Sequence, residues 1–193
     1  MANATSNSGP IVLDATARRL YTASTAGLVD EYVLANATLD FPVMRDQALG
    51  CMAPVRLLAT GDKVLELCRD QGDIRRYSRS PVTFEGTVGD VGMIDVATPL
   101  AGDRAAAVRV SPPQLVLLDL LAGSPTFTNG PTIPDRATAI TSSSDGFAVA
   151  TAHNSGSGSE VRLWRVDGGT LSMVGSTQID GIVTALAIST PGT

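Results

Sequence analysis

Residues 137–178, ATAITSSSDGFAVATAHNSGSGSEVRLWRVDGGTLSMVGSTQ, decide the fold. The stretch holds four short runs rich in Val, Ile, Thr and Ala, and turn-forming segments such as Ser144-Asp145-Gly146 separate them. The runs are predicted strands at Ala137–Ser142, Phe147–His153, Glu160–Val166 and Leu171–Gln178. Since the joining segments are short, the pattern indicates one antiparallel sheet of four strands.

Working outward, this unit is the last of a repeat. An aromatic or Leu residue recurs within the third run of each unit at Tyr32, Tyr77, Leu118 and Trp164, at intervals of 45, 41 and 46 residues. An independent series of aspartates recurs just before the next apolar run, at Asp46, Asp90, Asp135 and Asp180, with intervals of 44, 45 and 45 residues. Two series with one period indicate a true repeat of about 41–46 residues. We expect Tyr32, Tyr77 and Trp164 to occupy equivalent places on the third strand of successive units and to pack between sheets.

The earlier units contain the same four runs. The predicted strands are Ile11–Ala15, Arg19–Ser24, Leu28–Leu34 and Leu39–Arg45, then Val55–Thr60, Lys63–Cys68, Asp73–Arg79 and Val82–Thr87, then Gly92–Thr98, Arg104–Val110, Leu115–Leu121 and Thr126–Thr132. A further strand is predicted at Gly181–Thr190. Four strands per unit at this period are typical of the blades of an all-β propeller, which leaves almost no helix. The expected organisation is a flexible tail at 1–8, blades at 9–47, 48–90, 91–135 and 136–180, and a partial blade at 181–193.

The pattern resembles the WD-repeat β-propeller family. Val161-Arg-Leu-Trp164-Arg-Val, the turn and strand Ser144-Asp145-Gly146-Phe-Ala-Val-Ala-Thr, and Gly181-Ile-Val-Thr-Ala-Leu-Ala-Ile-Ser carry this resemblance, which is good over 137–192 and fair over 9–37. The family's usual blade has a Gly-His pair whose His joins a hydrogen-bonded network with Ser or Thr, Asp and Trp. The one histidine here, His153, ends a strand instead. We therefore expect that network to be absent or rebuilt, and His153 to face solvent.

Composition excludes several classes of function. The formal net charge is −5, which disfavours nucleic acid as a partner. No apolar run is long enough to span a membrane, and the first residues do not form a secretory signal, so we expect a cytoplasmic protein. Cys51 and Cys68 lie 17 residues apart among apolar residues, which favours two reduced core thiols, with a disulfide as the alternative.

No catalytic, metal or cofactor site is predicted. One histidine and two cysteines without a Cys-x-x-Cys spacing do not make a zinc site. The stretch Gly86–Gly92 has the composition of a phosphate-binding loop, but no helix pattern follows, so we interpret it as a turn between blades. Glu66, Glu85 and Asp95 could act as acid and base in a propeller hydrolase, although nothing in their spacing selects them.

The repeated aspartates are the candidate partner-binding residues. In the WD-repeat family the turn between the last strand of one blade and the first strand of the next lies on the face most used for partners. The resemblance therefore implies an acidic rim of Asp46, Asp90, Asp135 and Asp180, partly neutralised by Arg45 and Arg136. The alternative is that each Asp only caps its own turn.

The predicted function is a non-catalytic scaffold for protein–protein interaction, a propeller subunit of a larger assembly. Two alternatives stay open. The last stretch, Val161–Leu171 followed by Asp180–Leu186, is similar to blades of actin-interacting protein, which would imply a cofactor of cofilin in actin filament disassembly; the other alternative is a propeller hydrolase. Because 193 residues supply only about four blades, we expect a further chain or another subunit to complete the ring.

Overall fold

The computed structural model describes residues 9–35, 38–39, 44–47, 51, 53–60, 62–69, 71–79, 81–90, 92–101, 103–120 and 126–189. Every regular element in these ranges is a β-strand, which confirms the all-β prediction. Within them, no helix is long and apolar enough to cross a membrane. The predicted tail, residues 1–8, lies outside the described part of the chain.

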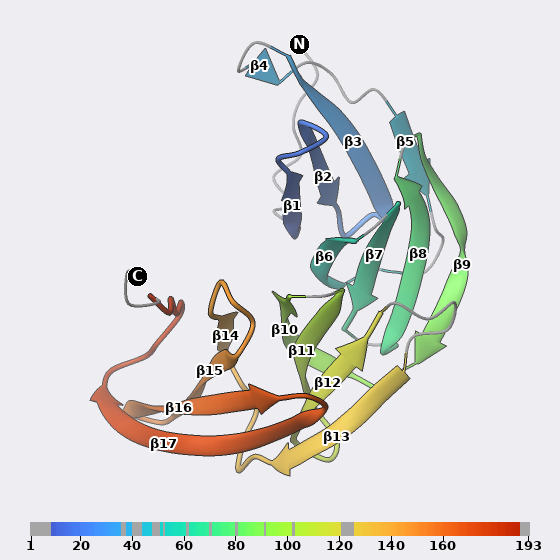
Figure 1. Cartoon of the computed structure of the whole chain (residues 1–193). Coiled ribbons are helices and arrows are strands. Elements are labelled where there is room, and N and C mark those ends of the chain that lie inside the picture. Colours follow the sequence, from blue (N-terminus) through green and yellow to red (C-terminus); the bar gives the residue numbers. More distant parts are fainter. Residues whose placement is uncertain are drawn as a thin grey trace. The chain divides into compact units, whose positions relative to one another are not determined.

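The strands form four sheets (Figure 1); neighbours in sequence are neighbours in the sheet, except that in the first sheet β3 pairs with both β4 and β5. Sheet 1 contains β1 (Ile11–Asp14), β2 (Arg19–Ala23), β3 (Leu28–Ala35) and β5 (Met44–Gln47), with the short β4 (Thr38–Leu39) paired to the end of β3. Sheet 2 contains β6 (Pro54–Thr60), β7 (Lys63–Cys68), β8 (Asp73–Arg79) and β9 (Val82–Asp90).

Sheet 3 contains β10 (Ile94–Leu100), β11 (Arg104–Arg109), β12 (Gln114–Asp119) and β13 (Thr126–Thr132). Sheet 4 contains β14 (Ala139–Ser142), β15 (Ala148–Ser155), β16 (Gly158–Asp167) and β17 (Thr170–Asp180). The chain divides into two compact units, Met1–Thr87 and Val88–Thr193.

Three predicted segments differ from the structure. In sheet 1 the run predicted at 39–45 corresponds to β4 (Thr38–Leu39) and β5 (Met44–Gln47), and residues 40–43 lie outside the described part of the chain. The stretch Gly86–Gly92 is not a turn up to Asp90, since β9 runs that far. Residues 181–189 form no ladder. The N–H of Gly181 donates to the backbone oxygen of Ser157 in the β15–β16 turn, and side chains bond the backbone oxygen of Gly181 and both backbone groups of Val183.

Each unit has its own core between two sheets. In the first unit, Tyr21, Val29, Leu57, Val64 and Tyr77 belong to one buried cluster of sheets 1 and 2. In the second unit, the corresponding cluster of sheets 3 and 4 includes the following buried side chains: Leu100, Val108, Leu115, Leu117, Val149 and Trp164. Alternation along the strands produces this arrangement, because every second side chain points to the same face.

The repeated aromatics occupy matching places in three ladders. Tyr77 lies opposite Val64, Trp164 opposite Val149, and Tyr32 opposite Leu20. Tyr77 and Trp164 are buried, as predicted. Tyr32 is only partly buried, so the expectation that it packs between sheets is wrong.

The partial exposure of Tyr32 follows from the face on which it lies. Sheet 1 packs against sheet 2 through its opposite face, which carries Tyr21 and Val29. On the face of Tyr32, the neighbouring side chains Ile11 and Leu13 are 58% and 55% exposed. We call Ile11, Leu13, Leu20 and Tyr32 the open face of sheet 1. Apolar side chains at such exposure on one sheet face mark a surface that favours a covering partner.

Candidate functional site

The structure describes three of the six predicted rim residues with their side chains. Asp135 and Arg136 lie in the connection between β13 and β14, and Asp180 ends β17 beside Gly158. All three are exposed. For the others only the backbone is described: Arg45 and Asp46 lie within β5, and Asp90 ends β9.

Arg136 forms its ion pair with Asp95 of β10. Its Nε lies 3.0 Å from Oδ1 and 2.9 Å from Oδ2 of that carboxylate, and its Nη2 also bonds Oδ1. The carboxylate of Asp95 is buried, whereas the Arg136 side chain is 62% exposed. These bonds to Asp95 raise the pKa of Arg136. The pair fixes the start of the β13–β14 connection onto sheet 3.

His153 is 3% exposed, so the expectation that it faces solvent is wrong. The indole Nε1 of Trp164 donates to Thr151 Oγ1 at 3.0 Å, and Thr151 Oγ1 lies 2.8 Å from His153 Nε2. His153 Nδ1 lies 3.2 Å from the backbone oxygen of Asp135. Since a carbonyl can only accept, Nδ1 carries the proton and the Thr151 hydroxyl donates to Nε2. The network expected from the WD-repeat resemblance is therefore rebuilt, with its histidine on β15.

This network predicts a stability that falls at acid pH. Burial lowers the pKa of His153 below its usual value of 6.5. As pH falls below about 6.5, His153 becomes protonated in the unfolded chain but stays neutral in the folded chain. The free energy of unfolding therefore decreases as pH falls. Urea titrations at pH 7.5 and 5.5 should show this loss in the natural chain and a smaller one in His153→Gln. An equal loss in both proteins would contradict the assignment.

A second group of bonds holds the connection that leaves sheet 4. Ser159 Oγ donates to the backbone oxygen of Gly181 at 2.7 Å, and the N–H of Val183 donates to Ser159 Oγ at 3.0 Å. The side chains of Asn154 and Thr138 both donate to the backbone oxygen of Val183, at 3.3 and 3.2 Å. Polar side chains therefore bond both connections at this edge of sheet 4: the one that enters the sheet before β14 and the one that leaves it after β17.

We call the exposed residues of this edge the turn edge; they are Asp135, Arg136, Ser155, Gly156, Ser157, Asp180 and Ile182. Ile182 is 67% exposed and Asp135 and Asp180 supply two carboxylates. The edge therefore offers a partner both apolar contact and negative charge on a backbone that is already ordered.

The first unit contains a pocket of about 440 Å³ that the sequence did not suggest. It lies where the β1–β2, β6–β7 and β8–β9 turns meet, and its lining residues are Asp14, Thr16, Ala17, Arg19, Tyr21, Asp62, Lys63, Ser78 and Arg79. At its wall the hydroxyl of Tyr21 donates to the backbone oxygen of Arg79 at 2.6 Å, and Arg79 forms an ion pair with the buried carboxylate of Asp14. Burial raises the pKa of Tyr21. Both arginines of its lining form ion pairs with buried carboxylates, Arg79 with Asp14 and Arg19 with Glu31.

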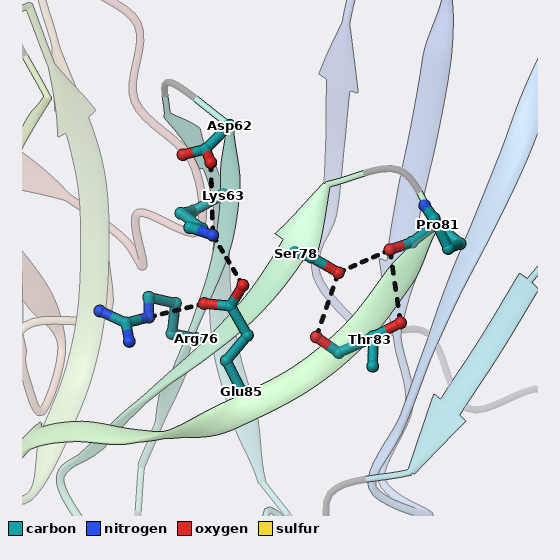
Figure 2. Close-up of polar contacts among 7 residues, drawn as sticks. All are labelled: Asp62, Lys63, Arg76, Ser78, Pro81, Thr83 and Glu85. Atoms are coloured by element: carbon teal, nitrogen blue, oxygen red, sulfur yellow. Dashed lines mark hydrogen bonds and ion pairs between the residues drawn. The ribbon is translucent and has the colours of Figure 1, made fainter.

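Figure 2 shows the surface cluster beside this pocket. The carboxylate of Glu85 accepts from Lys63 Nζ at 2.6 Å and from Arg76 Nε at 2.9 Å, while Asp62 lies 3.3 Å from the same Nζ. In the same view, Ser78 Oγ donates to the backbone oxygen of Pro81 at 2.6 Å in the β8–β9 turn. The cluster ties β7, β8 and β9 together at this edge of sheet 2.

The three carboxylates that could have formed an acid and base pair have separate partners. Glu85 binds Lys63 and Arg76, and Asp95 binds Arg136. Glu66 is buried on β7 and accepts from the hydroxyl of Tyr77 at 2.8 Å. Burial raises the pKa of Glu66. Among the described residues, these carboxylates make no common catalytic group.

The cysteines form a disulfide between Cys51 and Cys68, with Cα atoms 5.7 Å apart. The expectation of two reduced thiols is therefore wrong. The disulfide forms because of the β6–β7 hairpin. Cys68 pairs with Pro54 in this hairpin, so the end of β7 lies beside the segment that precedes β6 and contains Cys51. The structure also places Glu66 next to both sulfurs, in a buried group with ligand atoms within 4.8 Å of one another.

Comparison with protein-family models and with curated proteins finds no match. Among solved structures, the chain is similar to the β-propeller domain of Cps50 (Swd1) from Myceliophteria thermophila, with a TM-score of 0.70, 15% identity, and coverage of 95% of this chain and 61% of that chain. It is also similar to U3-55K, with a TM-score of 0.68, 16% identity, and coverage of 92% and 56%. The chain spans less than two thirds of the length of either. With its four sheets of antiparallel strands, the chain has the β-propeller fold.

Proposed function

We propose that the chain is a non-catalytic scaffold that binds other proteins through the turn edge of sheet 4. The observation that carries this proposal is the double attachment of that edge. His153 holds the backbone of Asp135 on the entering side, and Ser159 holds Gly181 and Val183 on the leaving side. An edge ordered before binding loses little conformational entropy on binding, which favours affinity.

The chemistry of the turn edge indicates the kind of partner. Asp135 and Asp180 are exposed, and the guanidinium of Arg136 is engaged by Asp95. Complementary charge speeds and selects association, so a basic segment fits these carboxylates. An apolar residue of the partner would contact Ile182, which is 67% exposed.

Affinity capture from the native cell with the intact protein, read by mass spectrometry, tests this function. The double variant Asp135→Lys/Asp180→Lys should lose the partners that the natural chain retains, because like charges would then face a basic segment. Asp167→Lys is the matched control, since Asp167 is an exposed aspartate at the opposite end of sheet 4. Identical partners with all three proteins, or none with the natural chain, would overturn the proposal. Recovery of actin and cofilin would favour the actin-disassembly alternative.

A further inference from the structure

The buried group Cys51, Glu66 and Cys68 contains an oxygen that the disulfide form leaves without a bond. Glu66 Oε2 accepts from the Tyr77 hydroxyl at 2.8 Å, but Oε1 is buried and has no hydrogen-bond partner. All three residues are at most 2% exposed. A buried unpartnered carboxylate oxygen is rare in folded proteins, and one reason for such an atom is an ion that it ligates.

We propose that these three residues form a binding site for a zinc-type divalent cation when the disulfide is reduced. A dithiol would donate two electrons and two protons to the Cys51–Cys68 bond, giving two thiols and the oxidised form of the dithiol. Binding of Zn²⁺ then displaces one proton from each thiol, and any proton on Glu66, into the solvent. Two thiolates and one carboxylate are zinc ligands, and water takes the fourth position.

The backbone geometry suits this change. Two sulfurs at about 2.3 Å from a tetrahedral ion lie about 3.8 Å apart. The Cα atoms of Cys51 and Cys68 are 5.7 Å apart, and the three ligand atoms already lie within 4.8 Å of one another, so side-chain rotation suffices. Glu66 and Cys68 are two residues apart on β7 and thus point to the same face of sheet 2.

The charge around the group also favours the ion. Two thiolates and one carboxylate carry three negative charges, of which Zn²⁺ offsets two. Arg75 lies directly opposite Glu66 in the β7–β8 ladder, and its side chain is 5% exposed. Its guanidinium also lies 3.6 Å from the carboxylate of Asp73, so it offsets only part of the remaining charge of the group. In a reducing compartment the group would hold the cation, and in an oxidising one it would hold the disulfide.

Cobalt titration tests the proposal on the full chain. The protein is reduced with a phosphine under nitrogen, and Co²⁺ replaces Zn²⁺ as the spectroscopic probe. One Co²⁺ per chain should give a thiolate charge-transfer band in the near ultraviolet, and Zn²⁺ should abolish it. Glu66→Gln should weaken Co²⁺ binding about tenfold or more, and Cys51→Ser should abolish the band. Glu85→Gln and His153→Gln are controls that should bind as the natural chain does.

A measurement on the unaltered sequence keeps the test independent of folding in the variants. Zn²⁺ should slow the alkylation of both cysteines in the reduced natural chain, and mass spectrometry measures the rate of that reaction. Reduced protein with no charge-transfer band and no protection from alkylation would overturn the proposal, as would Glu66→Gln that folds and binds Co²⁺ unchanged. This inference does not depend on the proposed scaffold function.

Discussion

Replacement of Trp164 by Ala is expected to lower the free energy of unfolding by about 3–5 kcal/mol. The indole is 1% exposed in the core between sheets 3 and 4, so the change leaves a large cavity. It also removes the donor to Thr151 Oγ1. Trp164 is the one tryptophan of the chain, so the measurement is a denaturant titration followed by far-ultraviolet circular dichroism rather than by fluorescence.

Phe147→Ala is the matched control for this experiment. Phe147 is an aromatic residue of the same sheet region but is 64% exposed. Its replacement should change the free energy of unfolding by less than about 0.5 kcal/mol, as for other exposed positions. A loss below about 1 kcal/mol in Trp164→Ala would show that the side chain is not buried and that the register of β15 and β16 is wrong.

Replacement of Glu31 by Ala is expected to have an effect of similar size. The Glu31 side chain is fully buried, forms an ion pair with Arg19, and accepts from the backbone N–H of Val82 at 2.9 Å. Removal of one partner from a buried ion pair costs about 3–5 kcal/mol, and because the Arg19 side chain is 27% exposed and regains some water, we expect a loss toward the lower end of that range. In this case the groups left are the guanidinium of Arg19 and the N–H at the start of β9.

Glu85→Ala is the contrasting variant. Glu85 also contacts two cations, Lys63 and Arg76, but at the surface of sheet 2 (Figure 2). Exposed ion pairs contribute little, since water and salt screen them. Denaturant titrations should therefore rank Glu31→Ala as far more destabilised than Glu85→Ala. Equal losses would contradict the burial of Glu31.

The strands were the most predictable feature because they rest on local pattern. Alternation and turn residues predicted β7, β8 and β13 at the residues where they begin and end. The prediction of a strand at 181–190 was wrong, because the sequence of a segment does not show whether a neighbouring strand is present to pair with it. A strand requires a neighbour, and the backbone at Gly181 and Val183 is instead bonded by side chains of sheet 4.

The polar interior was harder to predict, although signals for part of it exist. Val149, Thr151 and His153 are spaced by two along β15, so a buried Val149 implies that His153 shares its face. In the same way, Val29 places Glu31 on the inner face of β3. The pocket in the first unit had no such signal, because its lining comes from three turns that are distant in sequence.

For the rim residues, the sequence predicted their positions along the chain but not their contacts. Sequence spacing predicted Asp135 and Asp180 between the last strand of one unit and the first strand of the next; the structure has Asp135 in the β13–β14 connection and Asp180 at the end of β17. It could not show that Arg136 bonds Asp95 of another sheet, since that contact depends on how sheets 3 and 4 pack. The binding role of the rim stays a prediction.

A protein that works by contact with other protein surfaces needs surfaces suited to such contact, and the open face of sheet 1 is one that can be tested on the purified chain alone. Ile11 and Leu13 are more than half exposed on the face that also carries Tyr32. Exposed apolar area of this kind favours association. Sedimentation of the purified chain over a range of concentrations measures that tendency without knowledge of the natural partner.

We expect concentration-dependent association of the natural chain, and weaker association of Ile11→Lys/Leu13→Lys. Phe147→Lys, which alters an exposed apolar residue of the second unit, should associate as the natural chain does. A compact monomer of 19.9 kDa at all concentrations, unchanged by the double substitution, would contradict a role of the open face of sheet 1 in contacts with other protein surfaces.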